Sequence, residues 1–236
     1  MNNANAMTND EIYATLEKDL LTFRIKPGET LSENMLCSRF GISRTPVRSV
    51  LQRLQEKKLV QIIPHKGTVV TLIDYDVVSQ MIYQRVAVET MVLRDFIRSC
   101  NQTDVEMVRY AYTQLQELGR IHLEEPERFV ESDFLQQDLK MHGIWFRAMH
   151  KMALWEQLSG VQASYTRFCT LDIIDGNNTK DVLREHEEMM RLIDQRDEEP
   201  LEALMNRHLY GGVRRLGAQI FTRYASYFEH PSAEAT

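Results

Sequence analysis

The stretch GISRTPVRSVLQRL, residues 41–54, constrains the fold more than any other part of this sequence. Gly41 follows a short segment with helical apolar spacing, 33–39, and suits the left-handed residue that ends a helix. Ser43 then predicts the N-cap of a second helix, whose first turn tolerates Pro46. That helix has an apolar stripe at helical spacing: Val47, Val50, Leu51 and Leu54. Two helices joined by so short a turn predict a helix-turn-helix.

The flanking segments extend this motif into a small domain. Residues 10–23 have apolar side chains at helical spacing, and Lys26-Pro27-Gly28 ends the pattern. Ser32 predicts the N-cap of the helix at 33–39. Residues 60–72 contain two β-rich runs around Pro64-His65-Lys66-Gly67, which predicts a hairpin. Three helices followed by a hairpin predict a winged helix-turn-helix over residues 10–73.

From Asp74 onward, glycine and proline are sparse and the apolar spacing is helical. The predicted helices span 74–99, 102–122, 126–150, 152–174, 179–196 and 199–228. We therefore expect a mainly α protein, in which the winged helix-turn-helix precedes an all-α bundle of about six helices at 74–229. Residues 1–9 and 230–236 are expected to be tails, the first of them disordered.

The charge distribution is uneven. The whole chain has a formal net charge of −6, yet residues 39–66 carry seven basic side chains and one acidic one. A local basic stripe on an acidic protein is typical of a nucleic-acid contact. The three scattered cysteines fit reduced thiols, and neither a secretory signal nor a long apolar run is present. These features predict a cytoplasmic protein without a membrane segment.

Arg44 and Arg48 lie four residues apart on the predicted second helix, so they share one face. A recognition helix presents its N-terminal residues to base edges in the major groove, and arginine is the best partner of guanine. Ser43 and Thr45 can donate to phosphate oxygens at the helix start. Two arginines alone are more often a solvated charged face. The helix-turn-helix spacing and the hairpin favour the DNA-binding interpretation.

The stretch IKPGETLSENMLCSRFGISRTPVRSVLQRLQEKKLVQIIPHKGTVV resembles the DNA-binding domain of the GntR family of bacterial transcription regulators, over residues 12–72. The resemblance implies DNA contacts at Arg44, Thr45 and Arg48, with His65, Lys66 and Gly67 in the wing. This chain departs from the family at Lys57-Lys58, where Glu-Gly is usual, and at Ser49-Val50, where Glu-Ala is usual. Asn34 also replaces a side chain that is frequently longer.

Four side chains of the predicted bundle form a candidate metal site. Asp138 and His142 share a face of one helix, while His186 and His208 lie on two later helices. One carboxylate and three imidazoles from three helices can surround a divalent metal. The separations do not form a compact motif, however, and an interior histidine is more often a hydrogen-bonded core residue.

The stretches DLKMHGIWFRAMH, LREHEEMMRLIDQRD and EPLEALMNRHL resemble the FCD ligand-binding domain of the FadR-like branch of GntR regulators, over about residues 75–225. The resemblance implies a metal held by Asp138, His142, His186 and His208, with zinc or nickel favoured by the imidazole ligands. It also implies a small organic acid effector near the metal. Arg85 matches a family arginine that faces the effector cavity, and Arg167 is a second candidate or an ordinary surface arginine.

Together these features predict a homodimeric transcription regulator that binds a palindromic operator and responds to a small carboxylate in its helical domain. We expect no enzymatic activity and no catalytic residue. One alternative is a metal-dependent enzyme acting on a small organic acid, because such a metal site can activate water. Another is a metal-stabilised DNA-binding protein without an effector.

Overall fold

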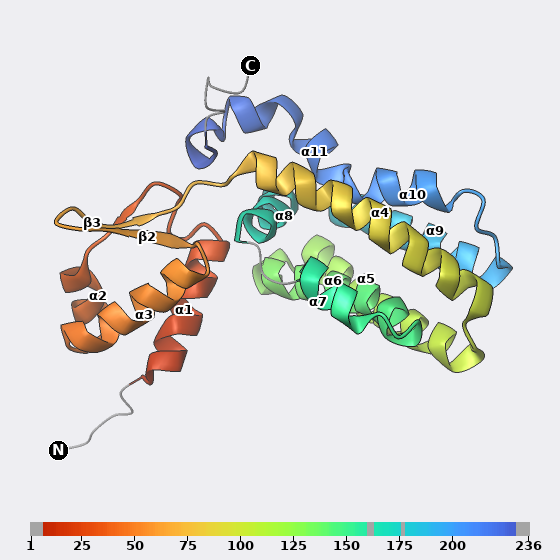
Figure 1. The fold of residues 1–236 in the computed structure, drawn as a ribbon, viewed down its shortest axis with the longest axis horizontal. Coiled ribbons are helices and arrows are strands. Elements are labelled where there is room, and N and C mark those ends of the chain that lie inside the picture. Colours follow the sequence, from red (N-terminus) through yellow and green to blue (C-terminus); the bar gives the residue numbers. More distant parts are fainter. Residues whose placement is uncertain (1–6, 160–162, 176–177, 230–236) are drawn as a thin grey trace. The chain divides into compact units, whose positions relative to one another are not determined.

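The computed structural model describes residues 7–159, 163–175 and 178–229 (Figure 1). Contacts within the chain divide these residues into two compact units. The first comprises residues 7–75, 163–167 and 218–229, and the second comprises 76–159, 168–175 and 178–217. Two segments that we expected in the helical domain therefore pack with the winged helix. None of the described helices combines the length and the apolar character that crossing a bilayer requires.

The first unit contains a winged helix-turn-helix, as predicted. Its elements are α1 (Asn9–Leu21), β1 (Thr30–Leu31), α2 (Glu33–Phe40), α3 (Arg44–Glu56), β2 (Val60–Ile63) and β3 (Gly67–Val70). The strands form an antiparallel sheet in the order β1-β3-β2, and Ile63 pairs with Gly67 at the end of the hairpin. The sequence did not predict β1, because two residues are too few to show the alternation of a strand.

Helix α3 packs its predicted apolar stripe into the core of this unit. The buried residues are Val47, Val50, Leu51 and Leu54. They belong to the same apolar cluster as Leu16 and Leu20 of α1 and Leu36 of α2. Because this face is buried, the opposite face of α3 and its first turn remain exposed for polar side chains.

Backbone conformation at the helix ends follows the residue types in most places. Gly41 ends α2 with φ 65°, and the Oγ of Ser32 accepts a hydrogen bond from the backbone N–H of Met35 at 3.5 Å. Lys58 takes φ 57° after α3, which costs an L-residue about 1 kcal/mol. Ser43 occupies the N-cap position of α3, but its side chain makes no capping hydrogen bond. The predicted N-cap position is therefore confirmed, and at this exposed turn solvent can satisfy the helix N–H groups in place of the side chain.

The helical part of the chain contains more and shorter helices than predicted. Its α-helices are α4 (Tyr75–Ser99), α5 (Gln102–Glu124), α6 (Glu131–Ala148), α7 (Met152–Ser159), α8 (Ala163–Asp175), α9 (Thr179–Gln195), α10 (Leu201–Leu209) and α11 (Gly211–Leu216). The expected helix at 152–174 is thus two helices, α7 and α8, and residues 160–162 between them lie outside the described residues. This division adds one α-helix to the expected six, and α11 is the other addition among the described residues.

The expected helix at 199–228 is also wrong as a single element. It is α10 and α11 followed by 3-10 turns at Gly217–Phe221 and Ala225–Tyr227. Glycine weakens a helix interior, and Gly211 begins α11 one residue after α10, with Tyr210 between them. Gly217 ends α11 with φ 46°. The expected helix at 126–150 differs less from the structure: a 3-10 turn at Pro126–Arg128 precedes α6.

Helices α6, α9 and α10 position the candidate metal site. Helix α5 packs against both α6 and α9, and α10 packs against α9. Gly143 on α6 allows a close approach of α7, since a Cβ atom there would lie 2.9 Å from the Nε1 of Trp155. This packing buries the middle of α6, including Met141, His142 and Trp145.

Candidate functional site

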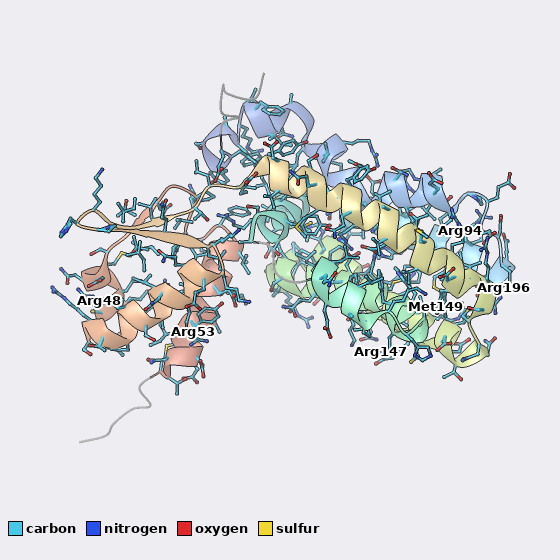
Figure 2. All side chains as sticks on the ribbon, in the orientation of Figure 1. Arg48, Arg53, Arg94, Arg147, Met149 and Arg196 are labelled. Atoms are coloured by element: carbon cyan, nitrogen blue, oxygen red, sulfur yellow. The ribbon has the colours of Figure 1, made fainter. Side chains whose placement is uncertain are left out.

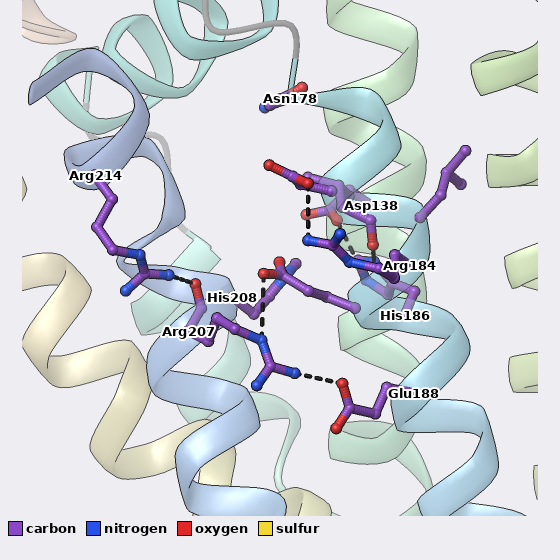
Figure 3. A network of polar contacts seen from close by, with 12 residues as sticks. Asp138, Asn178, Arg184, His186, Glu188, Arg207, His208 and Arg214 are labelled. Atoms are coloured by element: carbon purple, nitrogen blue, oxygen red, sulfur yellow. Dashed lines mark hydrogen bonds and ion pairs between the residues drawn. The ribbon is translucent and has the colours of Figure 1, made fainter.

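The four residues predicted to bind a metal come together in the helical unit. Asp138 and His142 lie one turn apart on α6, His186 lies on α9 and His208 lies on α10. One possible ligand atom from each of the four lies within 4.8 Å of the others. Figure 3 shows Asp138, His186 and His208 gathered between these helices. The residues therefore form one cluster despite their separation in the sequence.

Each histidine of the cluster has its Nδ1 atom bound to an acceptor. The Nδ1 of His142 lies 2.5 Å from the Oε2 of Glu89. The Nδ1 of His186 lies 2.8 Å from the backbone oxygen of Val182, and that of His208 lies 3.1 Å from the Oε2 of Glu185. Carbonyl and carboxylate oxygens only accept hydrogen bonds, so each Nδ1 carries the proton. In the neutral imidazoles, Nε2 is then the nitrogen that offers a lone pair.

The Nε2 atoms of the histidines and the Oδ1 atom of Asp138 form a set of ligand atoms that suits a cation. The Nε2 atoms of His142 and His186 are 3.2 Å apart, and the Oδ1 of Asp138 is 3.3 Å from the Nε2 of His186. Within the described part of the chain, this buried Oδ1 accepts no hydrogen bond. Lone pairs and a carboxylate oxygen in such proximity repel one another, whereas a divalent cation would bind them all. The three imidazoles favour zinc or nickel over magnesium or calcium.

The protonation of His186 is consistent with a metal ligand. Burial, reinforced by the neighbouring His208, lowers the pKa of His186 to about 3, although Asp138 acts in the opposite direction. Its imidazole is therefore neutral at pH 7, and neutral imidazole is the form that binds a metal.

The sequence did not single out Glu89, which lies on α4 and is completely buried. Its carboxylate accepts from the Nε of Arg85 and from the Nδ1 of His142. Burial by itself would raise the pKa of Glu89, but Arg85 and His142 outweigh that effect and lower it to about 2. The spacing of Arg85 and Glu89, one turn apart on a largely apolar helix, was the signal that could have identified it.

Arg85, a predicted effector-binding residue, lies beside the cluster. Its side chain is buried, and its Nη2 is 3.5 Å from the Nδ1 of His142. Arg85 also lies across the ring of Trp155, with its guanidinium carbon 6.0 Å from the ring centroid. The arginine is therefore held at the edge of the histidine cluster by Glu89 on one side and an aromatic ring on another.

Glu185 directly precedes His186 on α9. Its carboxylate accepts from His208 on α10 and lies 3.7 Å from the Nε of Arg207. Arg207 also pairs with Glu188 at the outer edge of the site (Figure 3). Two of the three histidines, His142 and His208, thus donate their Nδ1–H to a carboxylate. Such hydrogen bonds orient a metal-binding imidazole.

Arg167, the other predicted effector-binding residue, belongs to the winged-helix unit. Its buried guanidinium donates to the backbone oxygens of Thr71 and Leu72, at 2.6 and 3.1 Å. Burial lowers the pKa of Arg167 to about 10. These bonds tie α8 to the segment that follows β3, so the placement gives the effector role of Arg167 no support.

The predicted DNA-binding residues are all exposed on the winged helix: Ser43, Arg44, Thr45, Arg48, His65, Lys66 and Gly67. The Nη2 of Arg44 donates to the Oδ1 of Asn34 at 3.0 Å, and the Nε of Arg48 donates to the Oε1 of Glu33 at 2.9 Å. Asn34 and Glu33 of α2 therefore hold both guanidinium groups beside the start of α3. Figure 2 shows Arg48 at this part of the winged helix.

The tip of the wing is a tight turn. The backbone N–H of Lys66 donates to the oxygen of Ile63 at 3.0 Å, with Pro64 second and His65 third in the turn. His65 has φ 62°, and this order of proline and positive φ is typical of a type II turn. Gly67 follows with φ 111°, a conformation that favours glycine. The turn projects His65 and Lys66 into solvent, where a DNA backbone is accessible.

Comparison with known families agrees with this two-part architecture. The family of bacterial regulatory proteins known as the gntR family matches residues 8–70. The FCD domain family matches residues 80–211, which is more than half of the chain. The first match covers the helix-turn-helix and the wing, and the second covers all four residues of the metal cluster.

Individual relatives are regulators. The HTH-type transcriptional repressor RspR of Escherichia coli (strain K12) is 27% identical over 201 residues, which is 85% of each chain. The gluconate operon transcriptional repressor of Bacillus subtilis (strain 168) is 24% identical over 164 residues, 68% of this chain and 64% of the repressor. The structure of E. coli McbR/YncC has the same fold, with a TM-score of 0.64 and 15% identity over 90% of this chain and 99% of that chain. The chain therefore belongs to the GntR family, as a DNA-binding transcription regulator with an FCD domain and not an enzyme.

Proposed function

We propose that a small carboxylate, bound at a divalent metal in the helical unit, controls the affinity of this regulator for its operator. The observation that carries the proposal is the arrangement of the three histidines. Each has its Nδ1 on an acceptor, so that each directs Nε2 to a cluster that also contains the unpartnered Oδ1 of Asp138. This arrangement suits a metal better than it suits a hydrogen-bonded core.

Asp138, His142, His186 and His208 would hold the metal, with zinc or nickel as the favoured ions. Four protein ligands leave room for another ligand on an ion of higher coordination, so the metal would supply an acceptor site for a carboxylate oxygen. Arg85, which lies beside His142, would meet the charge of the effector. A buried carboxylate needs such compensation, because an unpaired charge in a low-dielectric site is costly.

On the DNA side, α3 would act as the recognition helix. Arg44 and Arg48 would contact base edges or phosphates, with Ser43 and Thr45 at the helix start and His65, Lys66 and Gly67 in the wing. A palindromic operator would be bound by a homodimer, in which each subunit contributes one recognition helix. Effector binding would change the relative placement of the two winged helices and thereby the operator affinity.

Elemental analysis of the purified protein tests the metal. We expect close to one divalent metal for each subunit of the wild type, and a large loss in His186→Ala and His208→Ala. Equal metal content in all three proteins would mean that the histidines are only core residues. The exposed His65, whose loss should not affect the metal, provides the matched control as His65→Ala.

A thermal-shift screen tests the effector. Sugar acids, hydroxy acids and short dicarboxylates should be compared with and without a chelator, because a ligand stabilises the folded state in proportion to ln(1 + [L]/Kd). Arg85→Ala should lose this stabilisation and keep its metal, whereas His142→Ala should lose both. If a compound stabilises the protein equally with and without the chelator, the effector binds away from the metal. The absence of hits would favour a metal-stabilised DNA-binding protein without an effector.

A further inference from the structure

We infer that the effector carries a single negative charge, so that it is a monocarboxylate and not a dicarboxylate. The inference rests on the proposed function and deepens it. It follows from the charges that the fold buries at the metal cluster. Those charges belong to Arg85 and Glu89 on α4 and to Asp138 on α6.

Each of these three groups is enclosed by protein. The side chain of Arg85 is 3% exposed, that of Glu89 is 0% exposed and that of Asp138 is 13% exposed. Glu89 accepts hydrogen bonds from both Arg85 and His142, which is the behaviour of an ionised carboxylate. The imidazoles count as neutral, since metal-bound histidine is neutral. The protein therefore contributes one positive and two negative buried charges, a net charge of −1.

Two further buried acidic groups of the helical unit, Glu185 and Asp172, each have a basic partner. Glu185 lies behind His208 and 3.7 Å from Arg207, whose side chain is 44% exposed. Asp172 on α8 accepts from the Nε and Nη2 of Arg215, at 3.0 and 2.7 Å. These pairs are neutral, and solvent screens the partly exposed Arg207 and its second partner, Glu188.

A divalent metal changes the net buried charge from −1 to +1. A residual charge in such a site is unfavourable unless a counter-charge accompanies it. An effector with one carboxylate neutralises the site, whereas a second carboxylate in the same enclosure restores an excess charge of the opposite sign. The site therefore selects its ligand by charge, and Glu89 supplies one of the two negative charges that set the selection.

Matched pairs of ligands test the inference without knowledge of the natural effector. Malonate and succinate should be compared with their monoamides, malonamate and succinamate, which have nearly the same size and one charge fewer. Binding to the zinc-loaded full-length protein should be measured by calorimetry at about pH 8, where both carboxyl groups of the diacids are ionised. We expect the monoamide of a pair to bind at least about tenfold more tightly than the diacid.

The Glu89→Gln variant should reverse this preference, because it raises the net charge of the metal-loaded site by one. Glu188→Gln is the matched control, since it makes the same change at a partly exposed position on α9 and should leave the preference unaltered. Glu89→Gln should also weaken zinc binding about tenfold or more, in a competition with a chelator that requires no effector. Unchanged zinc affinity in this variant would overturn the role given to Glu89.

The outcomes separate the inference from the function on which it rests. Metal-dependent binding of the diacids in preference to their monoamides would overturn the charge argument and leave the proposed function intact. If no carboxylate of either class bound the zinc-loaded wild type, the proposed function would fail, and the inference would fail with it. The wild-type comparison decides between these outcomes even if Glu89→Gln does not fold.

Discussion

Replacing Asp138 by asparagine should affect stability only when the metal is present. The Oδ1 of Asp138 is buried and accepts no hydrogen bond from the described residues. In the metal-free protein, the substitution removes a buried charge near three imidazoles and breaks no hydrogen bond at this oxygen. Burial would raise the pKa of Asp138, but the neighbouring histidines and Arg85 outweigh that effect and lower it. The free energy of unfolding should therefore stay within about 1 kcal/mol of the wild type. In the metal-loaded protein, the same substitution removes a ligand.

The size of the effect follows from linkage. At free zinc about 100 times the Kd, binding to the folded state alone adds about 2.7 kcal/mol to the free energy of unfolding. For a chain of this size, 1 kcal/mol corresponds to roughly 2–4 °C in Tm, so zinc should raise the Tm of the wild type by about 5–11 °C. Asp138→Asn at the same free zinc should lose most of this increment, because asparagine is a weaker ligand.

Calorimetric melting with zinc and with chelator measures both quantities. The scans should be made at about pH 8, above the ordinary pKa of imidazole, so that no proton replaces the metal. Asp172→Asn is the control, because Asp172 is also buried but accepts from Arg215 and from the Nδ2 of Asn178 at 2.8 Å. It should lose roughly 3 kcal/mol with or without zinc, as expected when a buried ion pair is broken.

Two results would refute this reasoning. A loss of stability in metal-free Asp138→Asn similar to that in Asp172→Asn would mean that the Asp138 carboxylate has a structural partner. A full zinc increment in Asp138→Asn would mean that the carboxylate is not a ligand. In either case, the convergence of Asp138 with the histidines would be a feature of core packing and not of a metal site.

Three further changes have expected outcomes. Arg44→Ala and Arg48→Ala should each weaken operator binding by roughly 1–3 kcal/mol. Lys66→Ala should weaken binding to all DNA sequences equally and reduce its salt dependence. Unchanged operator affinity in both arginine variants would exclude α3 as the recognition helix. Lys58→Gly should raise the free energy of unfolding by about 1 kcal/mol in denaturant titrations, because it relieves φ 57°, and a decrease would contradict this. Zinc affinity should fall as the pH falls toward the lowered pKa of His186, about 3, since protons then compete for its Nε2, and a profile that stays flat down to that pH in chelator competition would argue against His186 as a ligand.

The winged helix was predictable because its signals are local. Gly41, Ser32 and the apolar stripe of α3 act on their own turns and faces, and the structure places each as expected. The predictions failed where a boundary depends on packing. The segments 152–174 and 199–228 have continuous helical spacing, but each is divided into shorter elements in the fold.

The four residues that converge in the candidate metal cluster were predictable, and their surroundings were not. Asp138 and His142 share a helix face by spacing alone, and the family resemblance added His186 and His208. Glu89 was missed because its importance depends on Arg85 and His142 together, and His142 is 53 residues away along the chain. Arg167 resembled an effector ligand in the sequence, yet its donors bind the backbone of residues 71 and 72.

The sequence by itself determined the class of the protein, since turn residues, apolar periodicity and a basic helix start specify a winged helix through short-range forces. It also determined which side chains could contribute to a metal site. Only the tertiary structure decided which nitrogen of each histidine faces the cluster, because the acceptors on Nδ1 come from Glu89, Val182 and Glu185. The net charge enclosed at the cluster was decided in the same way, since burial by α4, α6, α9 and α10 selects which charged groups water can no longer screen.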